Sequence, residues 1–495
     1  MLAPWVTEEM KNFKLQDKRL NKRLAMVLEM LGQRPDKSIP LALNGGHAET
    51  TAAYRLFDNS KACFENILAS HIDATLERVS QQSLVIVAQD TTEIDLTRPE
   101  KQVQGAGLLD GNSRYGEFLH PLMAFTPDGT PLGTMYAELW TRDDEPNEEA
   151  STTSHRKQIA IEEKESVRWL ETQRYAQEVA RETPQTHFIS VADSEADIFE
   201  VIELTHEAPK NFDWIIRGCH NRSLVNPKKT LENAAQGDCV ASLLRERVQQ
   251  EAVRFIQPIS VRGRQAKVSC ETRGRRQPQQ SRESEVEVRA TTVTLRAPRR
   301  HDRKLQDTTL NAVLVSERNP PNGDTPVEWI LITSLPIDND EALLSVVRYY
   351  CARWMIEVYF RTLKSNCRIE SLRFEDLERF ERCLAVYMIV AWRTLYAVRL
   401  GRECPDLDCE AIFEPDEWRS VYRVVKNEDP PRTPPRLQEM IRMIARLGGY
   451  INRPRDDEPG PQTVGLGMQR MYDITRCWQL FGPDTRIQSK ETTCV

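Results

Sequence analysis

The sequence predicts an α/β protein in which a central domain, built on a mixed β-sheet, lies between two helical domains. Short apolar runs bounded by polar residues begin at Leu84 and recur as far as Ile332, which is typical of buried strands. Helical segments separate some of these runs and turns join others, so the sheet is expected to contain parallel and antiparallel strands. Residues 1–80 and 401–495 show helical periodicity instead.

Residues 1–80 are predicted to form a helical domain. Apolar residues at helical spacing mark one buried stripe, made of Leu20, Leu24, Val27, Leu28 and Leu31. A second helix is expected in HAETTAAYRLFDN. The basic residues at the start of the first helix are most simply a solvated edge.

Residues 81–400 are predicted to form the sheet domain, with helical periodicity over residues 154–180 and a helix from about Asp197. HPLMAFTPDGTPLGTMYAELW is expected to form two strands joined by a turn at Pro127-Asp128-Gly129. Four further strands are expected, at Leu84–Ala88, His187–Val191, Asp213–Arg217 and Trp329–Ile332. The first of these apolar runs is expected to lead into Asp90 and the second into Asp193.

Residues 239–318 interrupt this pattern with short alternating segments, which predict an antiparallel β-rich insertion. Over residues 241–310 there are 16 Lys and Arg against 8 Asp and Glu, a local charge of 16 − 8 = +8. A solvated β surface would explain this, but the contrast with the acidic chain favours a surface that faces a polyanion. A long helix is expected from near Asp338, where Asp338 and Glu341 have the spacing of a capping box.

The whole chain has 67 Lys and Arg against 74 Asp and Glu, a net charge of −7, which excludes a uniformly basic nucleic-acid coat. The odd number of cysteines, 11, lacks a paired framework and favours a reducing compartment. There is no signal-peptide pattern and no uncharged run long enough to span a bilayer, so a cytoplasmic protein is expected. P-loop, zinc-site and dinucleotide fingerprints are missing from the sequence.

Two proline-bearing linkers, residues 428–435 and 454–461, precede two apolar-striped helices in residues 401–495. One stripe consists of Leu437, Met440, Ile441, Ile444 and Leu447, and the other of Met468, Met471, Ile474, Trp478 and Phe481. These stripes indicate either the core of a small bundle or a surface for self-association.

Two carboxylates, Asp90 and Asp193, are expected at the carboxyl ends of neighbouring strands, where open α/β sheets bind their ligands. On the long helix, Tyr350, Arg353, Glu357 and Lys364 fall within an arc of about 60° at roughly 100° per residue. They could be surface ion pairs alone. Carboxylates from three elements also suit two divalent ions that act on a phosphodiester, with the cations beside them holding phosphates.

The blocks VAQDTTEIDL, SVADSEADIF, WILITSLP and YCARWMIEVYFRTLK resemble those of the Tn-five-like DDE transposases, the insertion-sequence-four group of bacterial cut-and-paste elements. The last block carries the Y-x-x-R-x-x-x-E-x-x-x-x-x-x-K signature of that group. The resemblance implies an RNase H-like catalytic domain with a β-strand insertion. It also implies an N-terminal domain that binds transposon ends and a C-terminal dimerisation domain.

Carried over by position, the resemblance implies that Asp90, Asp193 and Glu357 are catalytic and bind two Mg²⁺ ions, for which Mn²⁺ is expected to substitute. It implies DNA contacts for seven further side chains, namely Tyr350, Arg353, Lys364, Trp329, Arg217, Arg23 and Arg55. For Trp329 the contact would be stacking on a flipped base, and a buried strand aromatic is the alternative. Asp95 and Asp197 are interpreted as a loop residue and a helix-start residue outside the triad.

The expected function is that of a DNA transposase that hydrolyses each element end, forms and opens hairpins, and inserts the element into target DNA. Its expected partners are the terminal inverted repeats, target DNA and a second copy of the chain in a synaptic homodimer. The alternatives are a regulator that binds ends without cutting them and an RNase H-like nuclease without strand transfer.

Overall fold

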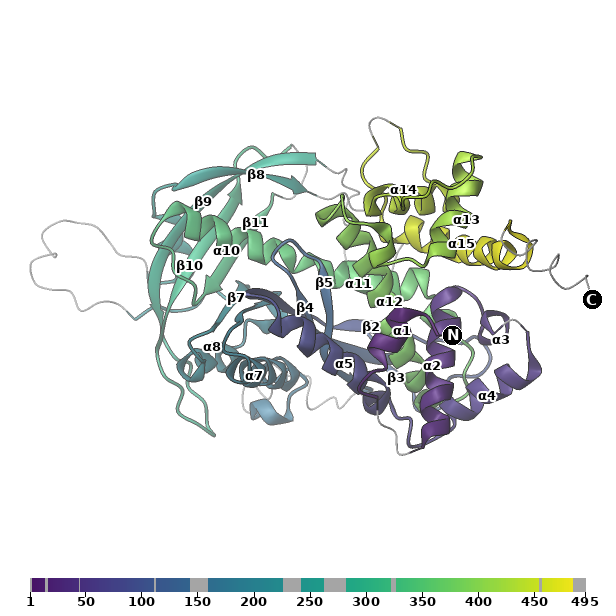
Figure 1. Cartoon of the computed structure of the whole chain (residues 1–495). Coiled ribbons are helices and arrows are strands. Elements are labelled where there is room, and N and C mark those ends of the chain that lie inside the picture. The colour runs from purple at the N-terminus through teal and green to yellow at the C-terminus, as the bar shows by residue number, and fades with distance from the viewer. Residues whose placement is uncertain are drawn as a thin grey trace, which may run out of the picture. The chain divides into compact units, whose positions relative to one another are not determined.

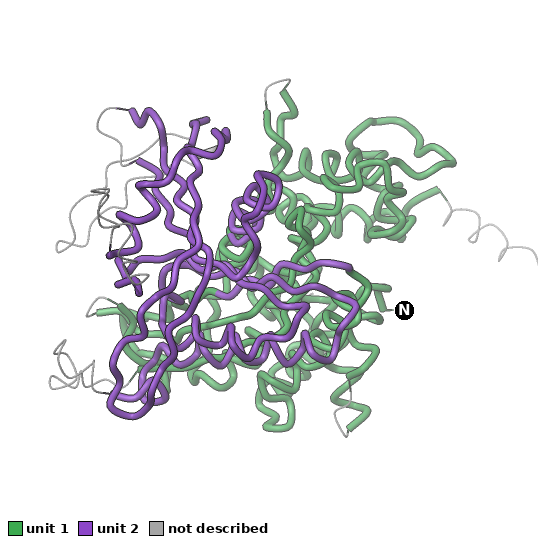
Figure 2. Tube along the Cα trace, turned by 90° about the vertical axis from the view of Figure 1, so that its left-hand side faces the viewer, with its two compact units in different colours: residues 1–82, 90–146, 354–495 green, residues 83–89, 147–353 purple. Residues whose placement is uncertain are grey.

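The structure is a computed structural model, and it describes residues 2–13, 17–43, 45–110, 113–142, 159–225, 242–261, 282–321, 326–453 and 456–483. The whole chain is drawn in Figure 1, and it divides into the two compact units that Figure 2 colours separately. Unit 1 contains residues 1–82, 90–146 and 354–495, and unit 2 contains residues 83–89 and 147–353. The domain bounds expected from the sequence stay predictions.

Unit 2 is built on a mixed sheet in the order β1-β6-β7-β11-β10-β9-β8. Strands β1, β6 and β7 are parallel, and the pairs from β7 to β8 are antiparallel. The strands are β1 (Leu84–Gln89), β6 (His187–Ala192), β7 (Phe212–Gly218), β8 (Phe255–Val261), β9 (Arg282–Leu295), β10 (Thr308–Glu317) and β11 (Glu328–Thr333). The β-rich insertion therefore continues the sheet beyond β11.

The parallel strands are apolar runs because helices and neighbouring strands bury them. Val85, Ile86, Val87 and Ala88 of β1 are all fully buried, as a strand covered on both faces requires. Helices α7 and α10 both pack against β6. The helices of unit 2 are η2 (Ile161–Glu163), α7 (Val167–Glu182), η3 (Ser194–Ala196), α8 (Phe199–Glu203), η4 (Leu204–Glu207), α9 (Leu244–Gln249) and α10 (Asp340–Ala352).

Unit 1 contains a smaller antiparallel group of strands in which β4 pairs with β2, β3 and β5. These strands are β2 (Thr92–Asp95), β3 (Gly107–Leu108), β4 (Tyr115–Phe125) and β5 (Pro131–Trp140). The expected turn between β4 and β5 is confirmed, since Gly129 adopts a φ of +87° and its N–H donates to the carbonyl of Thr126.

The remaining elements of unit 1 are helical. They are α1 (Pro4–Glu9), α2 (Lys18–Gln33), α3 (Ile39–Ala42), α4 (His47–Phe57), α5 (Phe64–Ser80), α11 (Trp354–Arg361), η6 (Thr362–Asn366), η7 (Ile369–Ser371), α12 (Leu377–Glu403), η8 (Cys409–Ala411), α13 (Pro415–Lys426), α14 (Leu437–Leu447) and α15 (Pro461–Phe481). The predicted stripe of α2 is buried at all five positions. Among the described helices, α12 alone has the length and apolar composition to cross a membrane, and 78% of its most apolar stretch is buried inside the structure.

Several sequence expectations are wrong in detail. The helix expected over residues 154–180 begins only at Val167, and residues 154–158 lie outside the described part of the chain. Helix α10 is capped by Asn339, whose side chain accepts from the N–H of Ala342, and not by the expected Asp338. The expected long helix is two α-helices, α10 and α11, followed by the π-helical turn η6.

Candidate active site

Two of the expected carboxylates follow the ends of adjacent parallel strands. Asp90 comes directly after Gln89, the last residue of β1, and Asp193 comes directly after Ala192, the last residue of β6. The register pairs Ala88 with Val191, so both strands end at the same level. This is the edge of a parallel sheet at which ligand sites form.

Asp193 lies between two guanidinium groups. Its Oδ1 accepts from the backbone N–H of Ser194 at 2.5 Å and lies 3.8 Å from Nη1 of Arg217. Its Oδ2 lies 3.6 Å from Nη2 of Arg353. Both guanidinium contacts are longer than hydrogen bonds, so they attract the carboxylate without binding its oxygens directly. The Asp193 side chain keeps 29% of its surface exposed, whereas that of Arg353 keeps 7%.

Tyr350 precedes Arg353 by one turn of α10 and is 5% exposed. Burial raises the pKa of the Tyr350 hydroxyl to about 12, and the negative charge of Asp193 adds to this effect. The hydroxyl therefore stays protonated at neutral pH and can donate a hydrogen bond to an anionic oxygen.

Trp329 on β11 contacts Tyr350, with ring centroids 5.4 Å apart. It shares a face of the sheet with Arg217, because Leu331 pairs with Arg217 and side chains alternate along a strand. Trp329 is half-buried. Its contact with DNA stays a prediction.

Glu357 and Lys364 lie in unit 1. Glu357 is in the first turn of α11 and is half-buried. Lys364 is in the π-helical turn η6, where Nζ donates to the backbone carbonyl of Glu93 and lies 3.5 Å from Oε1 of Glu370. Each residue of a π-helical turn rotates by less than in an α-helix, so the 100° per residue used for the expected arc does not apply at Lys364.

The two carboxylates placed outside the triad lie elsewhere than expected. Asp95 is the last residue of β2 and not a loop residue, with Nη1 of Arg114 at 3.6 Å from its Oδ2. Asp197 ends the 3-10 turn η3 and is 3% exposed, whereas α8 begins only at Phe199. The D-S-E-A-D spacing gave no sign of this burial.

The N-terminal arginines expected at DNA lie on separate helices, Arg23 on α2 and Arg55 on α4. Arg23 is half-buried and Arg55 is exposed. Their DNA contacts stay predictions.

The basic insertion is partly neutralised within unit 2, because acidic side chains of the same unit pair with its described arginines. The pairs are Arg245 with Glu328, Arg247 with Glu251, Arg254 with Asp340, Arg282 with Glu317, Arg289 with Glu287, Arg300 with Glu200 and Arg303 with Glu162. Residues 262–281, which carry six further basic side chains, lie outside the described part. In the described strands, the positive charge left to face a polyanion is therefore smaller than the +8 counted from the sequence suggests.

The donor set of the expected triad, Asp90, Asp193 and Glu357, suits a hard divalent cation. Its three side chains offer carboxylate oxygens, which Mg²⁺ and Mn²⁺ prefer over nitrogen and sulfur. The oxygens of Asp193 are not taken up by direct hydrogen bonds to Arg217 or Arg353, given the distances above. The donor types of the three expected side chains therefore suit a divalent metal.

Three family models match successive parts of the chain. A transposase DNA-binding model matches residues 2–62, a transposase DDE domain model matches residues 174–392, and a Tn5 transposase dimerisation domain model matches residues 389–477. The matched DDE domain, with its mixed sheet, defines the protein as a DNA transposase and an enzyme. The DNA-binding and dimerisation matches on either side of it place the chain in the Tn5-like DDE transposases.

A solved structure is also similar, the piggyBac transposase synaptic complex with hairpin DNA, at a TM-score of 0.36 and 9% identity. The match covers 99% of this chain and 81% of that one. The family matches themselves give DNA and a second copy of the chain as partners, and DDE domains act with divalent metal ions.

Proposed function

We propose that this transposase cuts both ends of its own element with Mg²⁺ and joins them to target DNA, with Asp90, Asp193 and Glu357 as the metal-binding triad. The observation that carries the proposal is the position of Asp193 at the end of β6, level with the end of β1 and flanked by Arg217 and Arg353. When bound, the metal ions would activate the attacking oxygen and stabilise the leaving one.

The residues around Asp193 have roles that follow from their charge and burial. Arg353 is almost fully buried with its guanidinium toward Asp193, so its rotamer is restrained before DNA arrives. A phosphate beside the metal site would accept charge-assisted hydrogen bonds from Arg353 and Arg217 and a neutral one from the Tyr350 hydroxyl. These groups hold the scissile phosphate and orient it, and they need not move a proton.

The reaction sequence proposed is a series of phosphodiester exchanges. Water first attacks at the element end and releases a 3′-hydroxyl. This hydroxyl attacks the opposite strand, so one P–O bond forms as another breaks and a hairpin closes the end. A second water opens the hairpin, and the regenerated 3′-hydroxyl attacks target DNA in the same way. The terminal inverted repeats would be read by the N-terminal helices, and the reaction would occur in the bacterial cytoplasm on nucleoid DNA.

The test separates cutting from binding. Glu357→Gln removes one carboxylate charge and leaves the basic surfaces in place. This variant should shift end-containing DNA in a gel as the wild type does and produce no nick with Mg²⁺. Asp95→Asn is the matched control, since Asp95 is a half-buried carboxylate of unit 1 outside the triad, and it should nick normally.

Each result assigns a function. Normal nicking by Glu357→Gln would remove Glu357 from the triad. A wild-type protein that shifts DNA and never nicks it would be a regulator, and one that nicks but yields no joined products in a plasmid assay would be a nuclease.

A further inference from the structure

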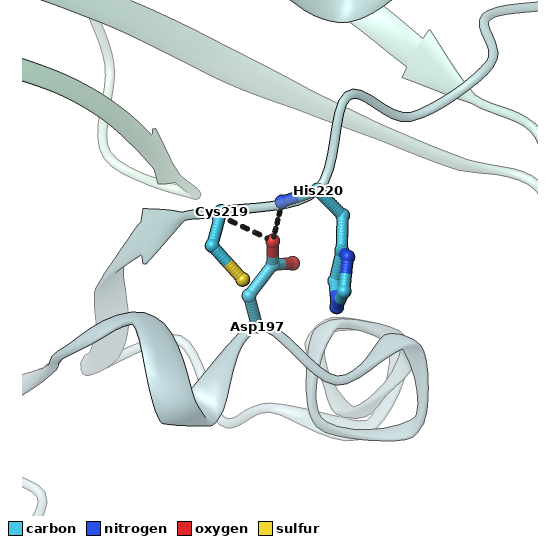
Figure 3. Close-up of side chains that lie close together, drawn as sticks. All are labelled: Asp197, Cys219 and His220. Atoms are coloured by element: carbon cyan, nitrogen blue, oxygen red, sulfur yellow. Dashed lines mark hydrogen bonds between the residues drawn. The ribbon is translucent and has the colours of Figure 1, made fainter. Parts of the chain in front are cut away.

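Asp197 is a buried carboxylate whose two oxygens are both taken by N–H donors. Oδ2 accepts from the backbone N–H groups of Cys219 and His220, each at 2.8 Å (Figure 3). Oδ1 accepts from Nε of Arg222 at 2.9 Å and from Nη2 of Arg222 at 2.5 Å. A buried carboxylate persists only when its charge is compensated in this way.

These bonds join two chain segments at the point where strand pairing stops. The β6–β7 ladder ends with Ala192 opposite Ile216. Asp193 follows β6 and Arg217 lies near the end of β7, both beyond this last pair. No hydrogen bond of the parallel ladder therefore connects the two described segments that carry them. The carboxylate of Asp197 supplies the missing acceptor for the two N–H groups that follow β7.

The turn that Asp197 ends is itself held by hydrogen bonds. Asp193 is the N-cap of η3, and its carbonyl accepts from the N–H of Ala196 at 3.1 Å. The N–H of Asp197 donates to the carbonyl of Ser194 at 3.2 Å, and Sγ of Cys219 donates to the same carbonyl at 3.5 Å. A displacement of Asp197 would therefore be transmitted through one short turn to Asp193.

A metal site is the competing interpretation of these residues. One ligand atom each from Asp197, Cys219 and His220 lies within 4.8 Å of the others. However, the carboxylate oxygens already accept four hydrogen bonds, two of them from a guanidinium that would repel a cation. Burial and the charge of Asp197 also raise the pKa of the Cys219 thiol, which disfavours a thiolate ligand.

We propose that Asp197 is a positioning residue for catalysis, because it fixes the turn of Asp193 against the strand end of Arg217. The inference rests on the proposed function, in which Asp193 binds metal. Small displacements of a catalytic group are costly, since misplacement by 1 Å can reduce a rate by about 100-fold. The role is therefore expected to show as weaker metal use and not as weaker DNA binding.

The test compares three variants. Asp197→Ala removes all four side-chain bonds, and Asp197→Asn keeps one oxygen for the backbone N–H groups but sets an amide against Arg222. Glu200→Gln is the matched control. Glu200 is 5% exposed, pairs with Arg300 at 2.7 Å and lines, together with Asp197, a pocket of about 210 Å³. Its side chain makes no described hydrogen bond to the turn of Asp193.

We expect the nicking rate at low Mg²⁺ to fall by about 10-fold or more in Asp197→Ala, less in Asp197→Asn, and to stay near wild type in Glu200→Gln. Raising Mg²⁺ should recover part of the loss. Binding of Mn²⁺ to the protein, followed by electron paramagnetic resonance, should weaken in the same order. Metal-free binding to end-containing DNA should not change in any variant.

Wild-type nicking by a folded Asp197→Ala protein overturns the inference, and if that variant does not fold, wild-type nicking by Asp197→Asn does so. An equal loss of nicking in Glu200→Gln also overturns the inference, because losing any buried carboxylate of this region would then reduce nicking. Asp193→Asn, measured alongside, separates the two proposals: if it cuts normally the triad assignment fails, and if it is inactive while Asp197→Ala is normal only the positioning role fails.

Discussion

The indole ring of Trp329 and the phenol ring of Tyr350 lie 5.4 Å apart between centroids, at an interplanar angle of 59°. The contact restrains a half-buried tryptophan beside a tyrosine that is one turn from Arg353. An aromatic ring held in this way is preorganised for stacking, because its rotamer is already restrained before a base arrives.

The first prediction concerns the role of Trp329 in hairpin formation. A hairpin unstacks a base at a cost of a few kcal/mol, and stacking on an aromatic ring returns about 1–3 kcal/mol. Trp329→Ala should leave the first Mg²⁺-dependent nick nearly intact and slow hairpin formation by about 10-fold or more, whereas Trp329→Phe should lose less. End-labelled DNA on a denaturing gel resolves the two products. Parallel loss of nicking, hairpins and folded protein would make Trp329 a packing residue only.

A second prediction follows from the exposed end of α15. Leu480 and Phe481 are 61% and 74% exposed, although the sequence placed Phe481 on an apolar stripe. Covering such side chains at a dimer interface gains about 1.5–3 kcal/mol each. Leu480→Ser with Phe481→Ser should therefore weaken the homodimer by at least about 10-fold in sedimentation equilibrium and reduce double-end cleavage. Leu407→Ser, at a 39% exposed loop position, is the control. Unchanged dimerisation would place the interface elsewhere.

The third prediction concerns the packing of α14 against α15. A Cβ at Gly467 would lie 1.9 Å from the carbonyl oxygen of Ile444, so the two helices touch backbone to backbone. Gly467→Ala must push them apart and should cost at least about 1–3 kcal/mol, seen as a lower melting temperature. Gly460→Ala is the control for added bulk, since its Cβ would meet no atom within 4 Å. Gly460 is the N-cap of α15, so this change costs only the difference between glycine and alanine at a cap. If Gly467→Ala melted at the same temperature as the wild type, α15 would be able to move away from α14 without cost.

The fourth prediction is a pH dependence of stability that originates in unit 1. Burial, and then the charge of Glu381, raises the pKa of Glu117 well above its usual value, and burial raises the pKa of Glu381 to about 7. Between the unfolded pKa and these folded values the folded state binds more protons, so stability falls as pH rises from about 4.5 through about 7. Glu117→Gln should raise the melting temperature at pH 8 by about 2–4 °C for each kcal/mol relieved and change it little at pH 4.5. The exposed Glu375→Gln should do neither, and a gain that is the same at both pH values would contradict the titration.

The strands that position Asp90 and Asp193 were predictable because each is an uninterrupted apolar run, and β1, β6, β7 and β11 match their predicted segments to within two residues. The exposed end of α15 and the burial of Asp197 were not predictable, because periodicity indicates which side chains are apolar and not what packs on them. The anchoring of Asp197 depends on backbone N–H groups of Cys219 and His220, which lie 22 and 23 residues away in the sequence and carry no side-chain signal.

The π-helical turn η6 also has a consequence for chain length. A π-helical turn is closed by an i→i+5 hydrogen bond, so it contains one residue more than an α-helical turn, which is closed by an i→i+4 bond. Deleting a single residue between Phe360 and Lys364 would therefore allow an ordinary α-helix to form there, and the lysine would no longer reach the carbonyl of Glu93. The number of residues between Glu357 and Lys364 is thus as much a part of the signature as the residues themselves, and a relative with one residue fewer would have to hold its lysine by a different helix geometry.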